Sequence, residues 1–191
     1  MTNDEKLKLF EIELNFIKSE NIKQFACDMI TKLPDYYFTI PASSTGKYHP
    51  SYSLGNGGLV RHTQSAVRIA KELFTIFPQY DDYWKDCIIT ALILHDGCKS
   101  GRVQSVYTAF DHPLQVVDLI QEEYPPIMQT DKPFIHDICE LISTHMGQWN
   151  TDYKGNEILP LPKTKIQNFV HMCDYLASRK FLEFNFDVYG G

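Results

Sequence analysis

The sequence lacks the paired cysteines that mark disulfide scaffolds and zinc ribbons. Its five cysteines include no C-x-x-C pair, and most of them lie in helix-like apolar stretches: Cys27, Cys87, Cys98, Cys139 and Cys173. Small secreted domains usually space their cysteines for cross-linking. We therefore expect buried free thiols in a reducing compartment, rather than disulfides or a zinc knuckle.

A targeting segment and an excess of positive charge are also absent. The N-terminus over residues 1–6 is polar and acidic, and no signal peptide or apolar run of membrane length follows it. We therefore expect a cytoplasmic protein with no membrane partner. Lysine and arginine number 18 against 24 acidic residues, which gives a net charge of -6. This balance argues against a broad basic surface that coats nucleic acid, but it leaves room for a small phosphorylated substrate.

The chain shows no internal repeat, no low-complexity run and no sign of a second domain. Its 191 residues are 43% hydrophobic and 22% charged, an ordinary balance for a globular protein. We predict a single domain over residues 1–191. Within it we expect N-terminal helices over 1–34, a ligand-bearing core over about 57–180, and an aromatic tail over 181–191 that we cannot place.

Apolar residues recur at helical spacing along most of the chain. Spacings of three and four predict helices over 7–17, 22–33, 59–73, 83–96 and 163–180. Asp111-His112-Pro113 and Asp131-Lys132-Pro133 are typical of helix starts, because proline fits the first turn. Residues 35–58 and 147–162 are expected to be loops, and a loop as long as the first is usually functional or mobile. The predicted fold is all-α, a single-domain helical bundle.

One predicted helix ends on two adjacent polar side chains that are able to bind metal ions. The apolar run over 88–94 is followed at once by His95 and Asp96. Burying an imidazole and a carboxylate is costly unless each finds a partner. A metal ion would satisfy both side chains, provided that other parts of the chain supply further ligands.

Three other helices present a residue of the same kind on an apolar face. His62 follows the apolar row of the helix over 59–73, His145 extends that of the helix after Pro133, and Asp174 extends that of 163–180. A single histidine in such a place is usually a hydrogen-bonded core residue. Four helices that each direct a ligand-type side chain inward are better explained by one metal site between them.

The order of these residues resembles that of a known family. His62, the pair His95-Asp96 and then Asp174 match the H…HD…D pattern of the HD superfamily of metal-dependent phosphohydrolases. The span from 57 to 99 is especially similar to the HD domain of bacterial 3′–5′ exoribonucleases. The resemblance runs from 57 to about 180 and implies an HD-type helical bundle with its metal site between helices.

Two histidines outside this H…HD…D pattern bear on the number of metal ions. His112 starts one predicted helix and His145 ends another. Family members with histidine at these points usually have two metal ions, so the resemblance implies a second ion on His112, His145 and Asp96. It places the first ion on four ligands, with Asp96 bridging the two ions: His62, His95, Asp96 and Asp174. The alternatives are a helix cap for His112 and a hydrogen-bonded core residue for His145.

The ligand types limit the metal and its chemistry. Imidazoles and carboxylates without thiolate favour Mn, Fe, Co, Ni or Zn, and do not choose among them. Two such ions can activate a water and hold phosphoryl oxygens during in-line attack. Asp96 and Lys99 are the expected catalytic residues, with Asp96 between the two ions. Lys99, one turn later, resembles the family's phosphate-facing lysine, and the alternative for it is a solvated side chain.

Several other residues are candidates for substrate binding. Arg179 resembles a cation found at this point in HD nucleotide hydrolases, and Trp149 could stack on a base, although such an aromatic is more often a lid over the core. Arg61 is expected to face the cleft or to pair with an acid, and His171 to lie behind the ligands or at the surface. Four loop residues either bind a base or phosphate or only pack the loop: Lys47, Tyr48, His49 and Tyr52.

Three functions follow as hypotheses. The leading one is hydrolysis of a phosphate ester or anhydride in a nucleotide or a short oligonucleotide. Similarity to exoribonucleases favours a phosphodiester in RNA or DNA, whereas an acidic chain without a separate RNA-binding domain favours a nucleotide. The second hypothesis is an HD-type di-iron oxygenase, which shares the six-ligand pattern, and the third is an HD module that binds nucleotide without turnover.

Overall fold

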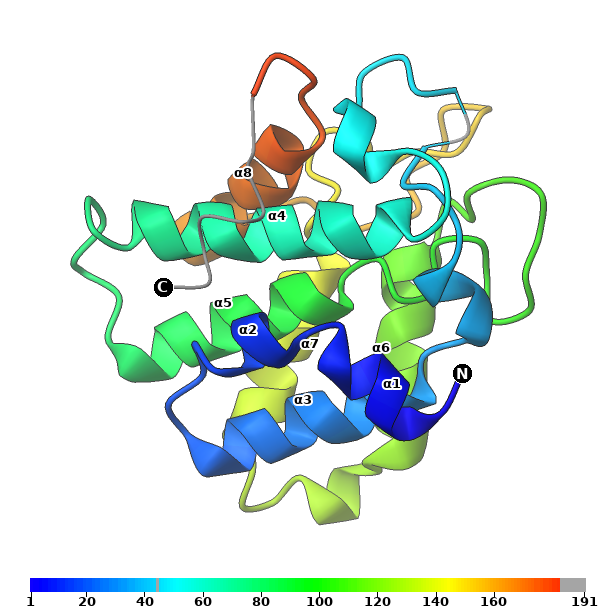
Figure 1. Ribbon diagram of the computed structural model, residues 1–191. Helices are drawn as coiled ribbons and strands as arrows, with labels where there is room; N and C mark the ends of the chain where they lie inside the picture. The colour runs from blue at the N-terminus through cyan, green and yellow to red at the C-terminus, as the bar shows by residue number, and fades with distance from the viewer. Residues whose placement is uncertain (44, 183–191) are drawn as a thin grey trace.

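A computed structural model of the chain describes residues 1–43 and 45–182 (Figure 1). The described residues form eight α-helices: α1 (Asn3–Lys8), α2 (Glu11–Leu14), α3 (Glu20–Lys32), α4 (Gly58–Leu73), α5 (Asp82–Leu94), α6 (His112–Glu123), α7 (Pro133–Ser143) and α8 (Lys165–Ala177). They also form three 3₁₀ turns: η1 (Asp35–Phe38), η2 (Ser51–Ser53) and η3 (Pro126–Met128). Within these ranges the only β-type pairing is an isolated bridge between Thr151 and Glu157. The all-α prediction is confirmed.

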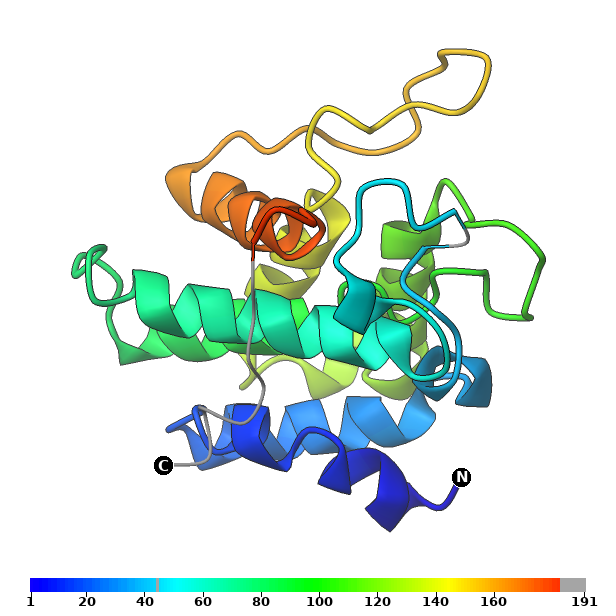
Figure 2. The same ribbon diagram turned by 45° about the horizontal axis from the view of Figure 1, so that its top comes forward.

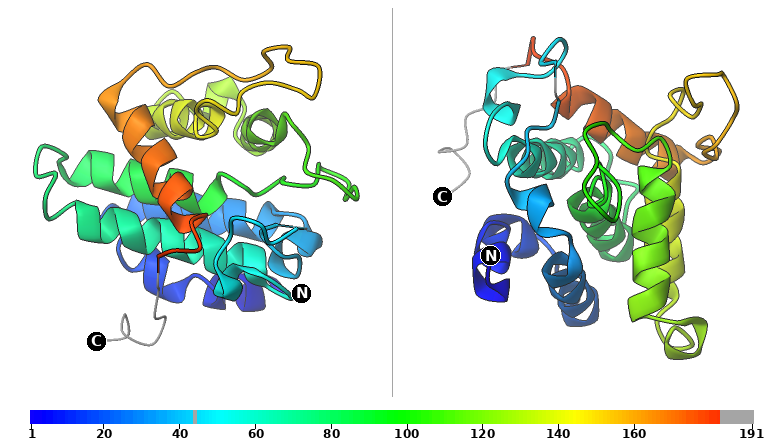
Figure 3. Two further views of the ribbon diagram at one scale, coloured as in Figure 1. Left: turned by 90° about the horizontal axis from the view of Figure 1, so that it is seen from above. Right: turned by 90° about the vertical axis from the view of Figure 1, so that its right-hand side faces the viewer.

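The central helix of the bundle is α5. It packs against α3, α4, α7 and α8, and all its side chains from Asp86 to Leu94 are buried. A helix that is apolar on every side is expected where neighbours enclose it. The helices α1 to α3 form one layer beside α5, and α4 and α8 cover its other side (Figures 1 and 2). The pair α6 and α7 lies on the far side of α5 in the view of Figure 1 and crosses it, with α7 packed against α5 (Figure 3).

The single helix predicted over 7–17 is broken into α1 and α2. A six-residue helix such as α1 has little stability of its own, so tertiary contacts decide where it ends. Lys6 in α1 is buried, and its Nζ donates to the carbonyl of Leu33 at 2.9 Å and pairs with Asp35 at 2.8 Å. Phe10, between the two helices, is fully buried. The apolar spacing is therefore right about which residues face the core and wrong about one continuous helix.

The irregular segment predicted over 35–58 is held against the start of α4. The guanidinium of Arg61 donates to three backbone carbonyls of this segment, those of Tyr52, Leu54 and Asn56. Arg61 therefore anchors the loop, which is neither of the two roles expected for it. At the other end of the segment, the buried Tyr37 hydroxyl donates to the carbonyl of Ile93 at 3.3 Å, which ties the loop to α5.

Gly58, the first residue of α4, lies so close to this loop that a larger residue does not fit. A Cβ atom added to Gly58 would lie 2.2 Å from the backbone oxygen of Ser53. We expect Gly58→Ala to lower the free energy of unfolding by at least about 3 kcal/mol, because the backbone has to shift to relieve the clash. Urea unfolding followed by circular dichroism measures this loss.

Gly55 provides the matched control for this steric argument. It also lies in the loop and has a φ of +69°, but nothing is found within 4 Å of a Cβ added to it. Gly55→Ala is expected to cost about 1–2 kcal/mol, the strain of an alanine in the left-handed region. Equal losses for the two variants would contradict the role of the Gly58–Ser53 contact.

The five cysteines behave as the sequence predicts. All are free thiols, and four of them are buried: Cys87, Cys98, Cys139 and Cys173. Burial raises the pKa of Cys98 to about 11 and that of Cys139 to about 12, so these thiols stay protonated and inert at neutral pH.

Three loops gather at one end of the bundle, at the upper right of Figure 1. They span 35–57, 95–111 and 144–164, and they lie where α4 and α6 begin and where α5 and α7 end. Residues 183–191, most of the tail that the sequence leaves unplaced, lie outside the described residues. None of the helices in the described ranges is both long and apolar enough to cross a membrane.

Candidate metal centre

The six predicted ligand residues come together at this end of the bundle. His62 lies in the first half of α4, His95 and Asp96 follow α5 directly, and His112 opens α6. His145 lies in the turn after α7, and Asp174 lies in α8. Their ligand atoms form three overlapping groups, within each of which all atoms lie within 4.8 Å of one another: His62, His95 and Asp96; His95, His145 and Asp174; Asp96, His112 and His145.

Three of the histidines have their ring orientation fixed in the same way. The Nδ1 atoms of His95, His112 and His145 lie 2.6, 2.8 and 2.8 Å from the carbonyl oxygen three residues earlier in the chain. These oxygens belong to Leu92, Ala109 and Ile142. A carbonyl can only accept, so Nδ1 carries the proton, and Nε2 of each neutral ring keeps its lone pair.

Each of these Nε2 atoms is buried without a hydrogen-bond partner. Nε2 of His112 lies 2.9 Å from Asp96 Oδ1, yet the direction does not suit a hydrogen bond. Three buried lone pairs without a partner are costly unless something binds them. A divalent metal ion fits this requirement, because neutral imidazole nitrogens and carboxylate oxygens are its usual ligands.

Asp96 lies between two sets of histidines and presents one oxygen to each. Its Oδ2 is 3.5 Å from Nε2 of His95 and 3.7 Å from Nε2 of His62. Its Oδ1 is 2.9 Å from Nε2 of His112 and 3.9 Å from Nε2 of His145. Only 2% of the Asp96 side chain is exposed, so neither oxygen has bulk water as its partner.

Asp174 completes the set around the Oδ2 side of Asp96. Its Oδ1 lies 2.9 Å from Nε2 of His62, which donates a hydrogen bond to it, and 3.4 Å from Nε2 of His95. Unlike the other three histidines, His62 has its Nδ1 buried without a partner. Asp96 belongs to two of the three groups of ligand atoms, and the third joins Asp174 to His95 and His145.

Both aspartates remain ionised in spite of their burial. Burial alone would raise the pKa of Asp96, but Lys99, His95 and His112 outweigh it and hold that pKa well below its usual range. Burial likewise opposes ionisation of Asp174, but a hydrogen bond from His62 and the nearby His95 ring lower its pKa well below the ordinary value. Both carboxylates are therefore ready to bind a cation at neutral pH.

The histidines differ in their affinity for protons. Burial lowers the pKa of His145 to about 3, and the neighbouring His95 ring adds to the effect. Burial also opposes a charge on His95, but Asp96 and Asp174 outweigh it and raise the pKa of that ring. His145 is therefore neutral over the whole physiological range, whereas protons and a metal ion would compete for His95.

Lys99 lies beside this cluster, as the sequence predicts. Its Nζ contacts Asp96 Oδ2 at 2.5 Å, and the side chain is largely buried. Lys99 also lines a cavity of about 230 Å³ between two of the loops, whose other lining residues are Ile40, Pro41, Ala42, Ser100, Gln104, Ser105, Val106 and Thr108. Lys99 thus pairs with the Asp96 carboxylate and also borders the adjacent cavity.

Arg179 and Trp149 belong to a row of planar side chains rather than to the cluster. Trp149 is 45% exposed and stacks on Tyr175, with ring centroids 5.6 Å apart and an angle of 13° between the planes. The guanidinium of Arg179 lies 4.4 Å from the centroid of the Tyr175 ring and 5.4 Å from that of Tyr48. Trp149 is therefore partly exposed and packed against Tyr175.

His171 lies directly behind one of the ligands. Its Nδ1 is 2.6 Å from the backbone oxygen of His145, and its Nε2 is 3.1 Å from Oε1 of Gln148. Gly147 packs against the same ring, since a Cβ atom there would approach the His171 ring to 2.4 Å. The sequence leaves two positions open for His171, behind the ligands or at the surface, and in the structure His171 lies behind His145.

His49 is a residue near the cluster to which the sequence assigns no definite role. Its ring lies 5.6 Å from that of His62, between centroids, and its Nδ1 is buried without a partner. Burial lowers the pKa of His49 to about 4, with His62 and Lys99 adding to the effect. No helical spacing marks this position, because the residue lies in the irregular segment before η2.

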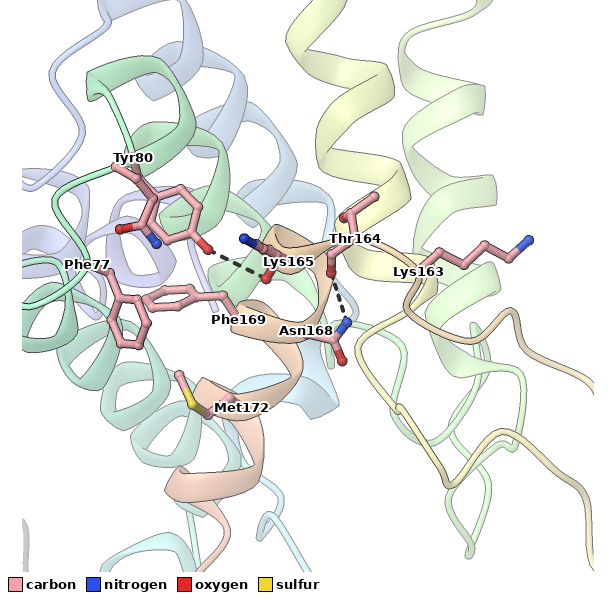
Figure 4. Close-up of a pocket in the computed structure, with 9 residues that line it drawn as sticks. Phe77, Tyr80, Lys163, Thr164, Lys165, Asn168, Phe169 and Met172 are labelled. Carbon is pink, nitrogen blue, oxygen red and sulfur yellow. Dashed lines mark hydrogen bonds between the residues drawn. The ribbon is translucent and has the colours of Figure 1, made fainter.

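A separate cleft lies between the loop after α4 and the start of α8 (Figure 4). It has a volume of about 440 Å³ and is lined largely by apolar and aromatic side chains: Phe77, Gln79, Tyr80, Lys163, Thr164, Lys165, Asn168, Phe169 and Met172. None of the six cluster residues lines this cleft. The chemistry-bearing side chains are therefore concentrated at the His/Asp cluster.

Comparisons with known proteins find no match to this chain. No protein-family model matches the chain, and no curated protein and no solved structure is found that is similar to it. The fold and the site themselves define an all-α protein with a buried cluster of histidines and aspartates that is able to bind a metal ion.

Proposed function

We propose that this chain is a metal-dependent phosphohydrolase of the HD type, which cleaves a phosphate ester or anhydride of a nucleotide or short oligonucleotide. The observation that carries the proposal is the division of the two Asp96 oxygens between two sets of histidines. A carboxylate in that position is suited to bridging two metal ions. The H…HD…H…H…D order of the same residues in the sequence supports the assignment to the HD superfamily.

The proposed ligand sets are those that the resemblance to the HD superfamily implies, and all their members belong to the cluster. One ion would be held by His62, His95, Asp96 and Asp174, and the other by His112, His145 and Asp96. The donor types favour Mn, Fe, Co, Ni or Zn. Two bound ions would supply an activated water and stabilise charge on the phosphoryl oxygens.

The protein's own side chains have separable tasks in this proposal. Asp96 holds the two ligand sets together. Lys99 offers a cation next to Asp96 and, because it also lines the adjacent cavity, it is placed to bind a phosphoryl oxygen of a substrate that enters there. The carbonyls behind His95, His112 and His145 keep the three neutral rings in one tautomer, in which Nε2 is the atom that can bind a metal ion.

A nucleotide suits the planar side chains that border the site. The face of Trp149 is exposed, and Tyr175 supports the indole from behind. Arg179, which stacks on Tyr175, adds a cation whose plane can pair with a base or a phosphate. Aromatic rings of this kind stabilise a bound base by about 1–3 kcal/mol each.

An HD-type di-iron oxygenase is the second candidate, because the same six residues and the same bridging carboxylate fit two iron ions. The position of Lys99 beside Asp96 favours the phosphohydrolase, since this cation matches a phosphoryl group. A module that binds nucleotide without turnover is the third candidate. The completeness of the cluster, in which all six residues converge, weakens it.

The test is metal analysis of the purified protein, followed by a panel of nucleotides and short oligonucleotides. The panel is run without oxygen, with Mn²⁺, Co²⁺, Ni²⁺ or Mg²⁺. We expect release of phosphate or nucleoside that a chelator abolishes. In a separate assay in air with Fe²⁺, oxygen consumption with a mixed-valent iron signal would instead establish the oxygenase. Nucleotide binding without product under any metal would instead support the third candidate, a module that binds nucleotide without turnover.

A further inference from the structure

His49 approaches the metal centre from a segment that supplies none of the six ligand residues. Its ring is the neighbour of the His62 ring, with centroids 5.6 Å apart and planes inclined by 59°. The charges of Lys99, Asp174 and Asp96 all act on it. His49 nevertheless belongs to none of the three groups of ligand atoms. It therefore borders the cluster without being part of it.

Both sides of the segment around His49 are anchored, so its position is determined. On the amino side, the Tyr48 carbonyl accepts the Lys180 N–H at 2.8 Å, and the Tyr48 ring lies under the Arg179 guanidinium. On the carboxyl side, η2 and the residues after it are held by the Arg61 guanidinium. A histidine fixed from both sides against a buried polar cluster is suited to a specific contact.

The Nδ1 atom of His49 is the group that needs a partner. It is buried and makes no hydrogen bond to any other residue. A neutral imidazole has one nitrogen that donates and one that accepts, and leaving a buried donor without an acceptor is costly. An anionic oxygen bound at the cluster would supply that acceptor.

We propose that His49 is a substrate-binding residue whose ring N–H donates to a non-bridging phosphoryl oxygen of the molecule bound at the His/Asp cluster. The inference rests on the proposed phosphohydrolase function and adds a contact from the loop before η2. His49 and Lys99 would then hold different oxygens of one phosphoryl group. Such paired contacts orient the group as well as bind it.

The test compares His49→Leu with His49→Asn. Leucine removes the hydrogen bond and keeps the bulk, whereas the asparagine amide retains a donor near the position of Nδ1. The protein is loaded with Mn²⁺, and its dissociation constant for inorganic phosphate is measured by calorimetry. Metal content is measured by atomic emission on the same samples. His136→Leu is the matched control, because His136 is exposed on α7.

We expect His49→Leu to weaken phosphate binding about tenfold, the effect of a lost hydrogen bond to a charged group, with His49→Asn within about threefold of wild type. Metal content should be the same in every variant, and His136→Leu should bind phosphate as the wild type does. An unchanged phosphate affinity in His49→Leu would overturn the inference. A fall in metal content would also overturn it, because His49 would then act through the ligands. If the metal-loaded wild type does not bind phosphate at all, the proposed function itself fails.

Discussion

Replacing Asp96 by alanine is expected to abolish turnover and to remove both metal ions together. Among the described residues, Asp96 is the one carboxylate that lies within 4.0 Å of histidines of both sets. Its loss would leave two incomplete ligand sets and would remove the buried partner of Lys99. We expect the rate of phosphate release to fall at least about a thousandfold, which corresponds to about 4 kcal/mol of transition-state stabilisation.

Metal content and activity together measure this effect. Asp174→Ala is expected to weaken mainly the binding of the ion on the His62 side, because Asp174 Oδ1 lies 2.9 Å from Nε2 of His62 and 3.4 Å from Nε2 of His95. In the other set only His145 is grouped with Asp174. Asp131→Ala, an exposed aspartate before α7, serves as the control and should change neither quantity. Full turnover by Asp96→Ala would refute the catalytic assignment, and an unchanged metal content would refute the bridge.

Residues on helices could be placed from the sequence because apolar spacing determines which face is buried. His62 and Asp174 lie in α4 and α8 at steps of three and four from buried neighbours, and both point inward. The same reasoning extends one residue past the end of a helix. His95 keeps helical φ and ψ angles as the C-cap of α5, so the row of apolar side chains before it still predicts its direction.

Contacts made by irregular segments could not be placed in this way. The direction of His49 depends on the contacts of Arg61 with backbone carbonyls and on the end of α8, and neither has a periodic signal. The break between α1 and α2 likewise depends on the burial of Lys6 against Leu33 and Asp35, which are distant in sequence. Periodicity describes which face is buried, whereas these features depend on particular tertiary partners.

The Nδ1 contacts of the ligand histidines are intermediate between residues that helical spacing predicts and contacts that depend on distant partners. Each of His95, His112 and His145 uses the carbonyl three residues earlier, so the partner is close in sequence. The contact forms only where the chain turns next to the histidine, at a helix end or just before a helix start. Helix boundaries are uncertain from sequence by a residue or two, and that uncertainty is enough to hide the contact.

Loading with a transition metal is expected to raise the melting temperature of the protein by about 5–15 °C. An ion that binds only the folded state at 100 to 1,000 times its dissociation constant stabilises it by about 2.7–4.1 kcal/mol, and each kcal/mol raises the melting temperature of a chain of this size by about 2–4 °C. The physical source is the cluster itself: two ionised, buried aspartates and three buried Nε2 lone pairs gain a partner.

A thermal scan with excess EDTA, and then with each of Mn²⁺, Co²⁺, Ni²⁺ and Zn²⁺, measures this shift. Ca²⁺ is the control ion, because it takes six to eight oxygen ligands and the cluster offers mainly imidazole nitrogens. The double variant Asp96→Ala/Asp174→Ala should show no shift with any ion, since it lacks both carboxylates. If no transition metal raises the melting temperature of the wild type, the buried His/Asp cluster is not a metal site, and the proposed hydrolysis loses its physical basis.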